Sequence, residues 1–163
     1  MKRSSARNRP PPPAVEAAEP SLGRVLDFMR LLWAIDHGLT QISKRMQRSH
    51  GITGPQRLVV RLVGQRPGIS AGTLAEILHL HPSTLTGVLR RLAGRGAITR
   101  TQDPADTRRA LFRLTPKGEA CDALRSGTVE SRVRAALASV PEEDLAAASR
   151  VLTRLARALS NDG

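Results

Sequence analysis

Apolar residues recur three and four positions apart along most of the chain, and this spacing predicts a mainly helical protein. The pattern predicts helices at residues 21–49, 53–63, 71–78, 82–95, 116–139 and 141–159. Gly51 is expected to end the first helix. Thr53 with Gln56 three residues later has the capping-box pattern, so the second helix begins there. This second helix is expected to bury Leu58, Val59 and Leu62.

Two short β-type runs follow the helix at residues 82–95, and the charged connection DPADTRR separates them. The runs are residues 97–102 and 110–115, and Ile69 is expected to pair as a one-residue strand. The helices at 71–78 and 82–95 are joined by the three-residue turn from His79 to His81. Helix–turn–helix followed by a hairpin predicts a mainly α fold with a small β-wing (α+β), a winged helix-turn-helix.

The helix at residues 82–95 has two contrasting faces. Its apolar stripe, expected to be buried, consists of Leu85, Val88, Leu89 and Leu92. The remaining surface carries small hydroxyl side chains, a glycine and arginines: Ser83, Thr84, Thr86, Gly87, Arg90 and Arg91. No acidic residue occurs between His81 and Gln102. Such a face suits a recognition helix lying against nucleic acid, although the solvent face of any amphipathic helix is the alternative.

The charge of the chain supports a polyanionic partner. The 163 residues carry a formal net charge of +12, and half of it lies in residues 82–118, with eight Lys or Arg against two Asp. Charge alone does not distinguish between nucleic acid and an anionic membrane surface as the binding partner. Aromatic residues make up only 2% of the chain, which argues against a base-stacking platform for single strands. No apolar run is long enough to span a membrane.

The organisation of the chain follows from these patterns. Residues 1–20 contain five prolines and few large apolar side chains, so a disordered basic tail is expected, either a solvated leader or an arm that touches DNA. The tail lacks the apolar segment of a signal peptide. The single cysteine, Cys121, excludes an internal disulfide and fits a reducing compartment. A chain of this length is expected to form one domain.

The order of elements, together with D-x-R and L-T-x-x-G at Asp106, Arg108, Leu114, Thr115 and Gly118, resembles the MarR family of bacterial transcriptional regulators. The segment ISAGTLAEILHLHPSTLTGVLRRLAGRGAITR is also similar to that family's helix-turn-helix and first wing strand. The resemblance implies a homodimer with long N- and C-terminal dimerisation helices at residues 21–52 and 119–163, around a DNA-binding lobe at 53–118. Without dimerisation, several apolar side chains of the terminal helices have no obvious partner: Leu22, Val25, Leu26, Leu152, Leu155 and Leu159.

Two positions depart from the family pattern. His79 stands where the helix-turn-helix turn usually has glycine, and we predict a left-handed backbone there, which histidine tolerates less well than glycine. Thr107 stands where family wings often have arginine directly after the aspartate. Asp106 and Arg108 are implied to pair and fix the hairpin, and Arg108 or Arg109 is expected to reach the minor groove.

The predicted function is sequence-specific binding of double-stranded DNA at a pseudo-palindromic operator, as a transcriptional regulator and repressor. The family resemblance implies release by a small molecule, often an anionic aromatic. Residues expected to line such an effector pocket are Trp33, His37, Arg57 and Arg61, although core or surface roles remain open for them. The alternative function is an architectural DNA binder with little sequence preference.

Enzyme, metal and cofactor functions are not predicted. No phosphate-binding loop, activated nucleophile or pair of catalytic carboxylates occurs in the sequence. The four histidines lack the spacing of a zinc site. The expected location is the bacterial cytoplasm, in association with the nucleoid.

Overall fold

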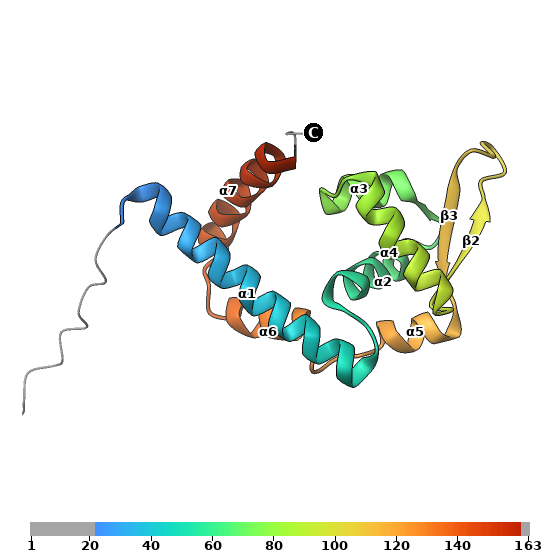
Figure 1. Cartoon of the computed structure of the whole chain (residues 1–163), viewed down its shortest axis with the longest axis horizontal. Helices are drawn as coiled ribbons and strands as arrows, with labels where there is room; N and C mark the ends of the chain where they lie inside the picture. Colours follow the sequence, from blue (N-terminus) through green and yellow to red (C-terminus); the bar gives the residue numbers. More distant parts are fainter. Residues whose placement is uncertain (1–21, 161–163) are drawn as a thin grey trace, which may run out of the picture. The chain divides into compact units, whose positions relative to one another are not determined.

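The computed structural model describes residues 22–160, so the predicted basic tail at residues 1–20 lies outside the described residues. The elements are α1 (Arg24–His50), α2 (Gly54–Gln65), β1 (Ile69–Ser70), α3 (Ala71–Leu78), α4 (Pro82–Gly94), β2 (Ile98–Gln102), β3 (Ala110–Leu114), α5 (Pro116–Asp122), α6 (Val129–Leu137) and α7 (Glu142–Ser160) (Figure 1). The chain divides into two units, residues 1–34 and 35–163, with the boundary inside α1. The predicted lobe boundary at residue 118 falls inside α5.

Local capping signals set the starts of the helices. The amide N–H of Gln56 donates to Oγ1 of Thr53 (3.3 Å), and the amide N–H of Thr53 donates to Oε1 of Gln56 (3.1 Å). This reciprocal pair is the predicted capping box. The hydroxyl of Ser70 accepts the amide N–H of Thr73 (3.2 Å) and caps α3 in the same way. The first helix ends at His50, directly before Gly51, as predicted.

A three-stranded antiparallel sheet in the order β1-β3-β2 forms the wing and its base. Ile69 pairs with Phe112, which confirms the predicted short strand. The β2–β3 hairpin aligns Ile98 with Leu114 and Gln102 with Ala110. Its tip extends away from the helices in Figure 1. The winged helix-turn-helix expected from the sequence is confirmed.

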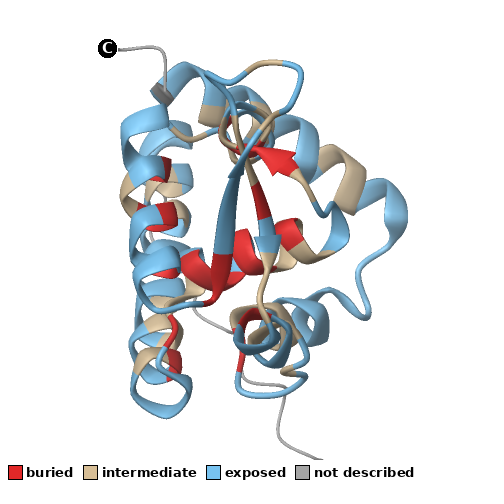
Figure 2. Ribbon diagram, turned by 90° about the vertical axis from the view of Figure 1, so that its right-hand side faces the viewer, coloured by how far each residue is buried: buried red, intermediate tan, exposed pale blue. Residues whose placement is uncertain are grey.

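The hydrophobic core lies between α2, α3, α4 and the base of the wing, with Met46 added from α1, and the buried residues are red in Figure 2. The buried apolar side chains are Met46, Ile52, Val59, Val60, Val63, Ile69, Leu74, Ala75, Leu85, Val88, Leu89, Leu92, Ala97, Ile98 and Phe112. One prediction for α2 is wrong, because Leu58 is 46% exposed while Val60 is fully buried. Successive residues are about 100° apart around a helix. The buried face is therefore centred between Val59, Val60 and Val63.

The long helix predicted at residues 116–139 is also wrong, because the structure has two helices there. Gly127 has φ +68, a left-handed conformation that interrupts the helix and suits glycine. Thr128 then caps α6, with its hydroxyl accepting the amide N–H of Ser131 (3.1 Å). The apolar pattern on both sides of the break keeps helical spacing, which conceals the break. The segment Ser126-Gly127-Thr128, a glycine followed by a helix-capping threonine, is the sequence signal for this break.

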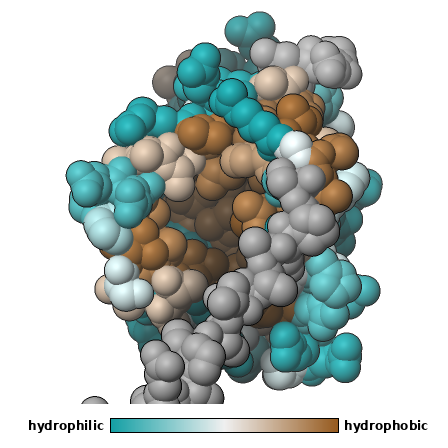
Figure 3. All heavy atoms as spheres, turned by 90° about the vertical axis from the view of Figure 1, so that its left-hand side faces the viewer, coloured by the Kyte–Doolittle hydropathy of each residue, from teal (hydrophilic) through white to brown (hydrophobic). Residues whose placement is uncertain are grey.

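Several helices expose apolar side chains, and such side chains are visible as brown atoms in Figure 3. In the first unit, the exposed large apolar residues are Leu22, Val25, Leu26, Phe28, Leu31 and Trp33. In the second unit, α7 exposes Val151, Leu152 and Leu159. None of the described residues of α6 or α7 belongs to the buried core. Within residues 22–160, no helix is both long and apolar enough to cross a membrane.

Candidate nucleic-acid interface

The recognition-type helix α4 buries the four leucine and valine residues predicted from its periodicity. The side chains expected to face DNA point outward, and Ser83, Thr84, Thr86, Arg90 and Arg91 are all exposed. Gly87 is half-buried among them. Since α3 and the wing base cover only the apolar stripe, the polar face of α4 is left open to a ligand.

The start of α4 is capped by a histidine that sequence analysis treated only as part of a turn. Nδ1 of His81 accepts the amide N–H of Ser83 (3.3 Å) and lies 2.8 Å from its hydroxyl. An accepting Nδ1 requires the neutral tautomer with the proton on Nε2. Ser83 therefore already has an internal partner on the face expected to meet DNA.

Two positions in the middle of α4 shape the surface presented to DNA. Thr86 donates its hydroxyl proton to the carbonyl of Pro82 (2.8 Å), so this hydroxyl can only accept from a base edge. A Cβ on Gly87 would lie 3.7 Å from Nη1 of Arg91, so the guanidinium of Arg91 already covers part of the glycine. The guanidinium of Arg90 makes no hydrogen bond or ion pair within residues 22–160. Arg90 is exposed on the same helix.

The turn before α4 has the predicted left-handed residue. His79 has φ 50 and ψ 41, and it is the only non-glycine residue with positive φ among those described. Its amide N–H donates to the carbonyl of Glu76 (3.2 Å), and that of Leu80 donates to the carbonyl of Ala75 (3.0 Å). These two bonds are the Schellman pattern that ends a helix. They fix the angle between α3 and α4.

Asp106 organises the tip of the wing. Its Oδ1 accepts the backbone N–H of Arg108 (3.1 Å) and lies 3.4 Å from Nε of the same residue. The predicted pairing of Asp106 with Arg108 is therefore present. The side chain of Arg108 remains 92% exposed, and Arg109 is also exposed. Both arginines of the tip can thus reach a neighbouring polyanion, and Thr107 directly precedes them.

The L-T-x-x-G part of the motif holds the wing to α5 and does not face the polar surface of α4. Oγ1 of Thr115 donates to the carbonyl of Gly96 (2.6 Å) and accepts the amide N–H of Gly118 (3.1 Å). A Cβ on Gly118 would lie 2.0 Å from the carbonyl oxygen of Ala97, which is closer than any real contact. Only glycine allows α5 to pack this closely against the first wing strand.

Arg95 was counted among the cations of the basic segment, but the structure gives it an internal role. Its guanidinium donates to the carbonyl of Gly51 and approaches Oε1 of Gln56 (3.4 Å). The side chain therefore ties the end of α4 to the α1–α2 turn. Its guanidinium therefore has partners within the lobe, unlike that of Arg90.

The four residues expected to form one effector pocket are not brought together as a set. Arg57 is 2% exposed and already donates to the carbonyls of Cys121, Asp122 and Leu124 and to Glu130, so it is not a free anion ligand, which corrects the expectation for it. Arg61 pairs with Asp122 (2.8 Å) and lines the same cavity as Arg57. His37 contacts Gln41 (2.8 Å) and lines a different, shallow depression on α1. Trp33 lies in the first unit and is 67% exposed.

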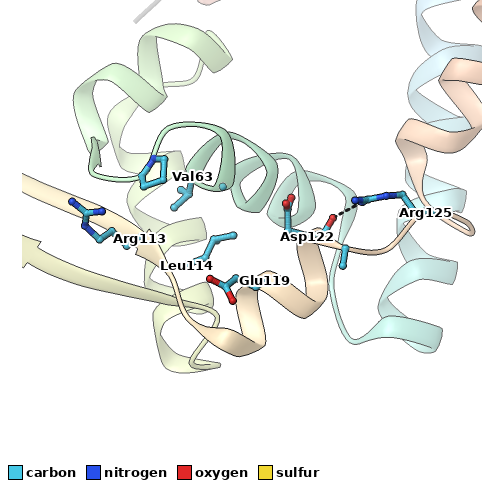
Figure 4. Close-up of a pocket in the computed structure, with 9 residues that line it drawn as sticks. Val63, Arg113, Leu114, Glu119, Asp122 and Arg125 are labelled. Atoms are coloured by element: carbon cyan, nitrogen blue, oxygen red, sulfur yellow. Dashed lines mark hydrogen bonds between the residues drawn. The ribbon is translucent and has the colours of Figure 1, made fainter.

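A second cavity lies where the C-terminal end of α2, strand β3 and α5 meet (Figure 4). It has a volume of about 350 Å³ and an apolar floor that includes Val63 and Leu114. Figure 4 shows Arg113 and Glu119 at its rim and the bond from Arg125 to the carbonyl of Asp122 (2.9 Å). Cationic and anionic side chains are balanced here, unlike on the face of α4.

Comparison with known proteins agrees with this geometry. A sequence model of the MarR family matches residues 52–110. The transcriptional regulator HosA of Escherichia coli O111:H- is 40% identical over 68 residues, which cover 42% of this chain and 50% of HosA. The chain therefore spans about half the length of HosA.

A longer match is the HTH-type transcriptional repressor Mb2911 of Mycobacterium bovis, with 31% identity over 112 residues, which cover 69% of this chain and 78% of the relative. Among solved structures, the PcaV transcriptional regulator of Streptomyces coelicolor in complex with its natural ligand is 27% identical. It has a TM-score of 0.67 and covers 80% of this chain and 92% of PcaV. The winged helix-turn-helix, the wing motif and these matches agree, and the chain belongs to the MarR family of transcriptional regulators.

Proposed function

We propose that the protein is a sequence-specific, double-stranded DNA-binding transcriptional repressor of the MarR type. The observation that carries the proposal is the exposed face of α4 with its hydroxyl and guanidinium groups, together with two exposed arginines at the wing tip of the same lobe. A helix of this kind fits the major groove, while an arginine at a wing tip fits the narrow minor groove of A·T-rich DNA. No catalytic role is part of the proposal.

In the proposed complex, each group on α4 has a separate task. Arg90 is assigned to O6 and N7 of a guanine, the commonest specific contact of arginine. Gly87 allows close approach of the helix, and Arg91 and Ser83 lie toward the backbone phosphates. Phosphate contacts supply affinity and register, whereas Arg90 supplies most of the discrimination between sequences.

A second copy of the chain is proposed to cover the exposed apolar side chains of α1 and α7. A lone protomer would leave Leu26, Leu152 and Leu159 in water, at 54%, 47% and 75% exposure. Burying apolar surface of this kind is the usual driving force for obligate dimers. Two-fold symmetry then requires a pseudo-palindromic operator with half-sites about 34 Å apart.

Selection of duplexes from a random library, followed by titration of the selected site at three salt concentrations, tests the proposal. Arg90→Ala is expected to weaken the selected site about tenfold or more while non-specific binding stays nearly constant. Arg109→Ala is expected to weaken all duplexes and to lower the salt slope by about one. Arg132→Ala, an exposed arginine of α6, is the matched control. Failure to enrich any sequence, with uniform coverage of DNA, would favour the architectural alternative.

Release by a small-molecule effector is the regulatory part of the proposal. It is supported by the relationship to PcaV, which was crystallised with its natural ligand. Since the target is chromosomal DNA, the proposed place of action is the bacterial cytoplasm at the nucleoid. Loss of the selected duplex on addition of a ligand, measured by anisotropy, is the corresponding assay.

A further inference from the structure

A cavity of about 270 Å³ lies between α2 and the junction of α5 with α6. Its charged lining consists of four arginines against one carboxylate: Arg57, Arg61, Arg125, Arg134 and Glu130. Ser131 adds a hydroxyl, and Leu124 is the one large apolar side chain among the described residues that line it. None of these lining residues is aromatic. The cavity therefore has the chemistry of an oxyanion site and lacks the flat apolar walls that an aromatic ligand needs.

The arginines of this cavity differ in how far they are already engaged. Nη1 of Arg61 donates to Oδ1 of Asp122 (2.8 Å), and Nη1 of Arg125 donates to the carbonyl of Asp122 (2.9 Å). The other guanidinium nitrogens of both residues have no partner within residues 22–160. Arg134 makes no hydrogen bond or ion pair with any described residue. Three guanidinium groups thus have free donors toward one cavity.

Only one of the two carboxylate oxygens of Glu130 has a hydrogen-bond partner among the described residues. Its Oε1 accepts from Nε of Arg57 (2.9 Å), and this contact joins the first turn of α6 to α2. Its Oε2 is buried and has no hydrogen-bond partner among the described residues. A buried carboxylate oxygen without a donor costs free energy. An incoming anion with several oxygens can accept from Nε of Arg57 and also from the arginines that Glu130 does not contact, without leaving such an oxygen unpaired.

We propose that this cavity binds a small multivalent oxyanion of the phosphate type, and that the anion displaces Glu130 from Arg57 and so breaks the ion pair that links α6 to α2. Arg134 supplies the first charge for the ligand, and Arg61 and Arg125 contribute their free N–H groups. Guanidinium forks match phosphate oxygens in geometry and charge. Binding of the anion is inferred from the cavity alone. The effect of the anion on DNA binding rests on the proposed function.

Release of α6 would change how the DNA-binding lobe is held. The bridge between Arg57 and Glu130 connects α2, whose Val59 and Val60 belong to the core of the lobe, to a helix that packs against this core through the half-buried Val129. In the proposed dimer, the orientation of α6 relative to α2 affects the spacing between the two copies of α4. The anion therefore favours a spacing that no longer fits the operator.

Calorimetric titration of the full chain with inorganic pyrophosphate, in metal-free buffer with ionic strength held constant by NaCl, tests the site. Arg134→Ala is expected to weaken pyrophosphate binding about tenfold, the typical loss when one strong charge-assisted contact is removed. Arg132→Ala, on the same helix but outside the cavity, should bind like wild type. Inorganic phosphate should bind more weakly than pyrophosphate, and salicylate more weakly still. Equal losses in the two arginine variants, or a preference for salicylate, would overturn the proposal.

Glu130→Gln tests the displacement. It removes the competing charge and keeps the size of the side chain, so pyrophosphate is expected to bind at least about threefold more tightly. Weaker binding in this variant would show that Glu130 does not compete with the anion. A merely structural Glu130 would lower thermal stability without tightening the anion, so both quantities are measured.

The effect of the anion on DNA binding is measured with the selected duplex. Saturating pyrophosphate should weaken binding of the duplex by wild type but not by Arg134→Ala. If pyrophosphate binds and the affinity for DNA stays constant, the release of α6 is refuted while the anion site stands. If no duplex is ever selected, the proposed function fails and the calorimetric result is unaffected.

Discussion

Replacement of His79 by glycine is expected to stabilise the protein, although the change removes a whole side chain. His79 has φ 50 and ψ 41, and its own amide N–H helps to end α3. Both hydrogen bonds of this turn are made by backbone atoms, so they survive the substitution. The imidazole is exposed, and its loss removes no core contact.

The size of the effect follows from two opposing terms. A left-handed backbone costs a residue with a Cβ about 1–2 kcal/mol, and glycine avoids this cost. Glycine loses about 0.5–1 kcal/mol more backbone entropy on folding than a residue with a side chain. The free energy of unfolding should therefore rise by about 0.5–1 kcal/mol for His79→Gly. For a chain of this length the corresponding rise in Tm is about 2 °C.

Urea and thermal unfolding followed by circular dichroism at one fixed protomer concentration measure the change, since dimerisation links stability to concentration. His79→Ala is the matched control, because alanine keeps the Cβ and hence the strain. It should lie within about 0.5 kcal/mol of wild type. If glycine is no more stable than alanine, left-handed strain at this turn is not a significant term and the reasoning is refuted.

Three further substitutions test other parts of the structure. Gly118→Ala places a Cβ 2.0 Å from the carbonyl oxygen of Ala97, so a loss of about 2 kcal/mol or more in unfolding free energy is expected, and a wild-type Tm would contradict the close packing of α5 on the wing. Arg57→Met removes the partner of the half-buried Glu130 and of the carbonyls at the end of α5, and should cost about 3–5 kcal/mol, while adding Glu130→Met should recover part of the loss in a double-mutant cycle. Asp106→Ala removes the acceptor that orders the wing tip and should change stability by less than about 1 kcal/mol, because the pair is exposed. The affinity of the Asp106→Ala variant for a selected duplex should nevertheless fall several-fold. An unchanged affinity would argue against a role of the wing in DNA binding.

The features that sequence analysis located correctly are those set by neighbouring residues. Thr53 and Gln56 lie one helical turn apart, so their capping box needs no distant partner. The stripe on α4 and the left-handed His79 are likewise fixed by local spacing and by the short turn between two helices. The break before α6 was also a local signal, Gly127 followed by Thr128, but the continuing apolar spacing outweighed it.

The roles of individual polar side chains in the candidate site could not be read in the same way. Arg57 and Arg61 are one turn apart on α2 and look alike in the sequence. Arg57 is buried because carbonyl groups at the end of α5, more than sixty residues away, converge on its guanidinium. Arg95 is withdrawn from the DNA-binding charge by the carbonyl of Gly51 in the α1–α2 turn.

By itself, the sequence determined the order of the elements as far as the wing, the polar face of the recognition helix and the basic wing tip, since helical periodicity, caps and turns are short-range properties. Only the tertiary structure decided which face of α2 is buried, which arginines remain free and where a cavity forms between α2 and α6. These depend on contacts between segments far apart in the chain. The free energy of burying a charge is set by all the groups that surround it, and no local pattern records them.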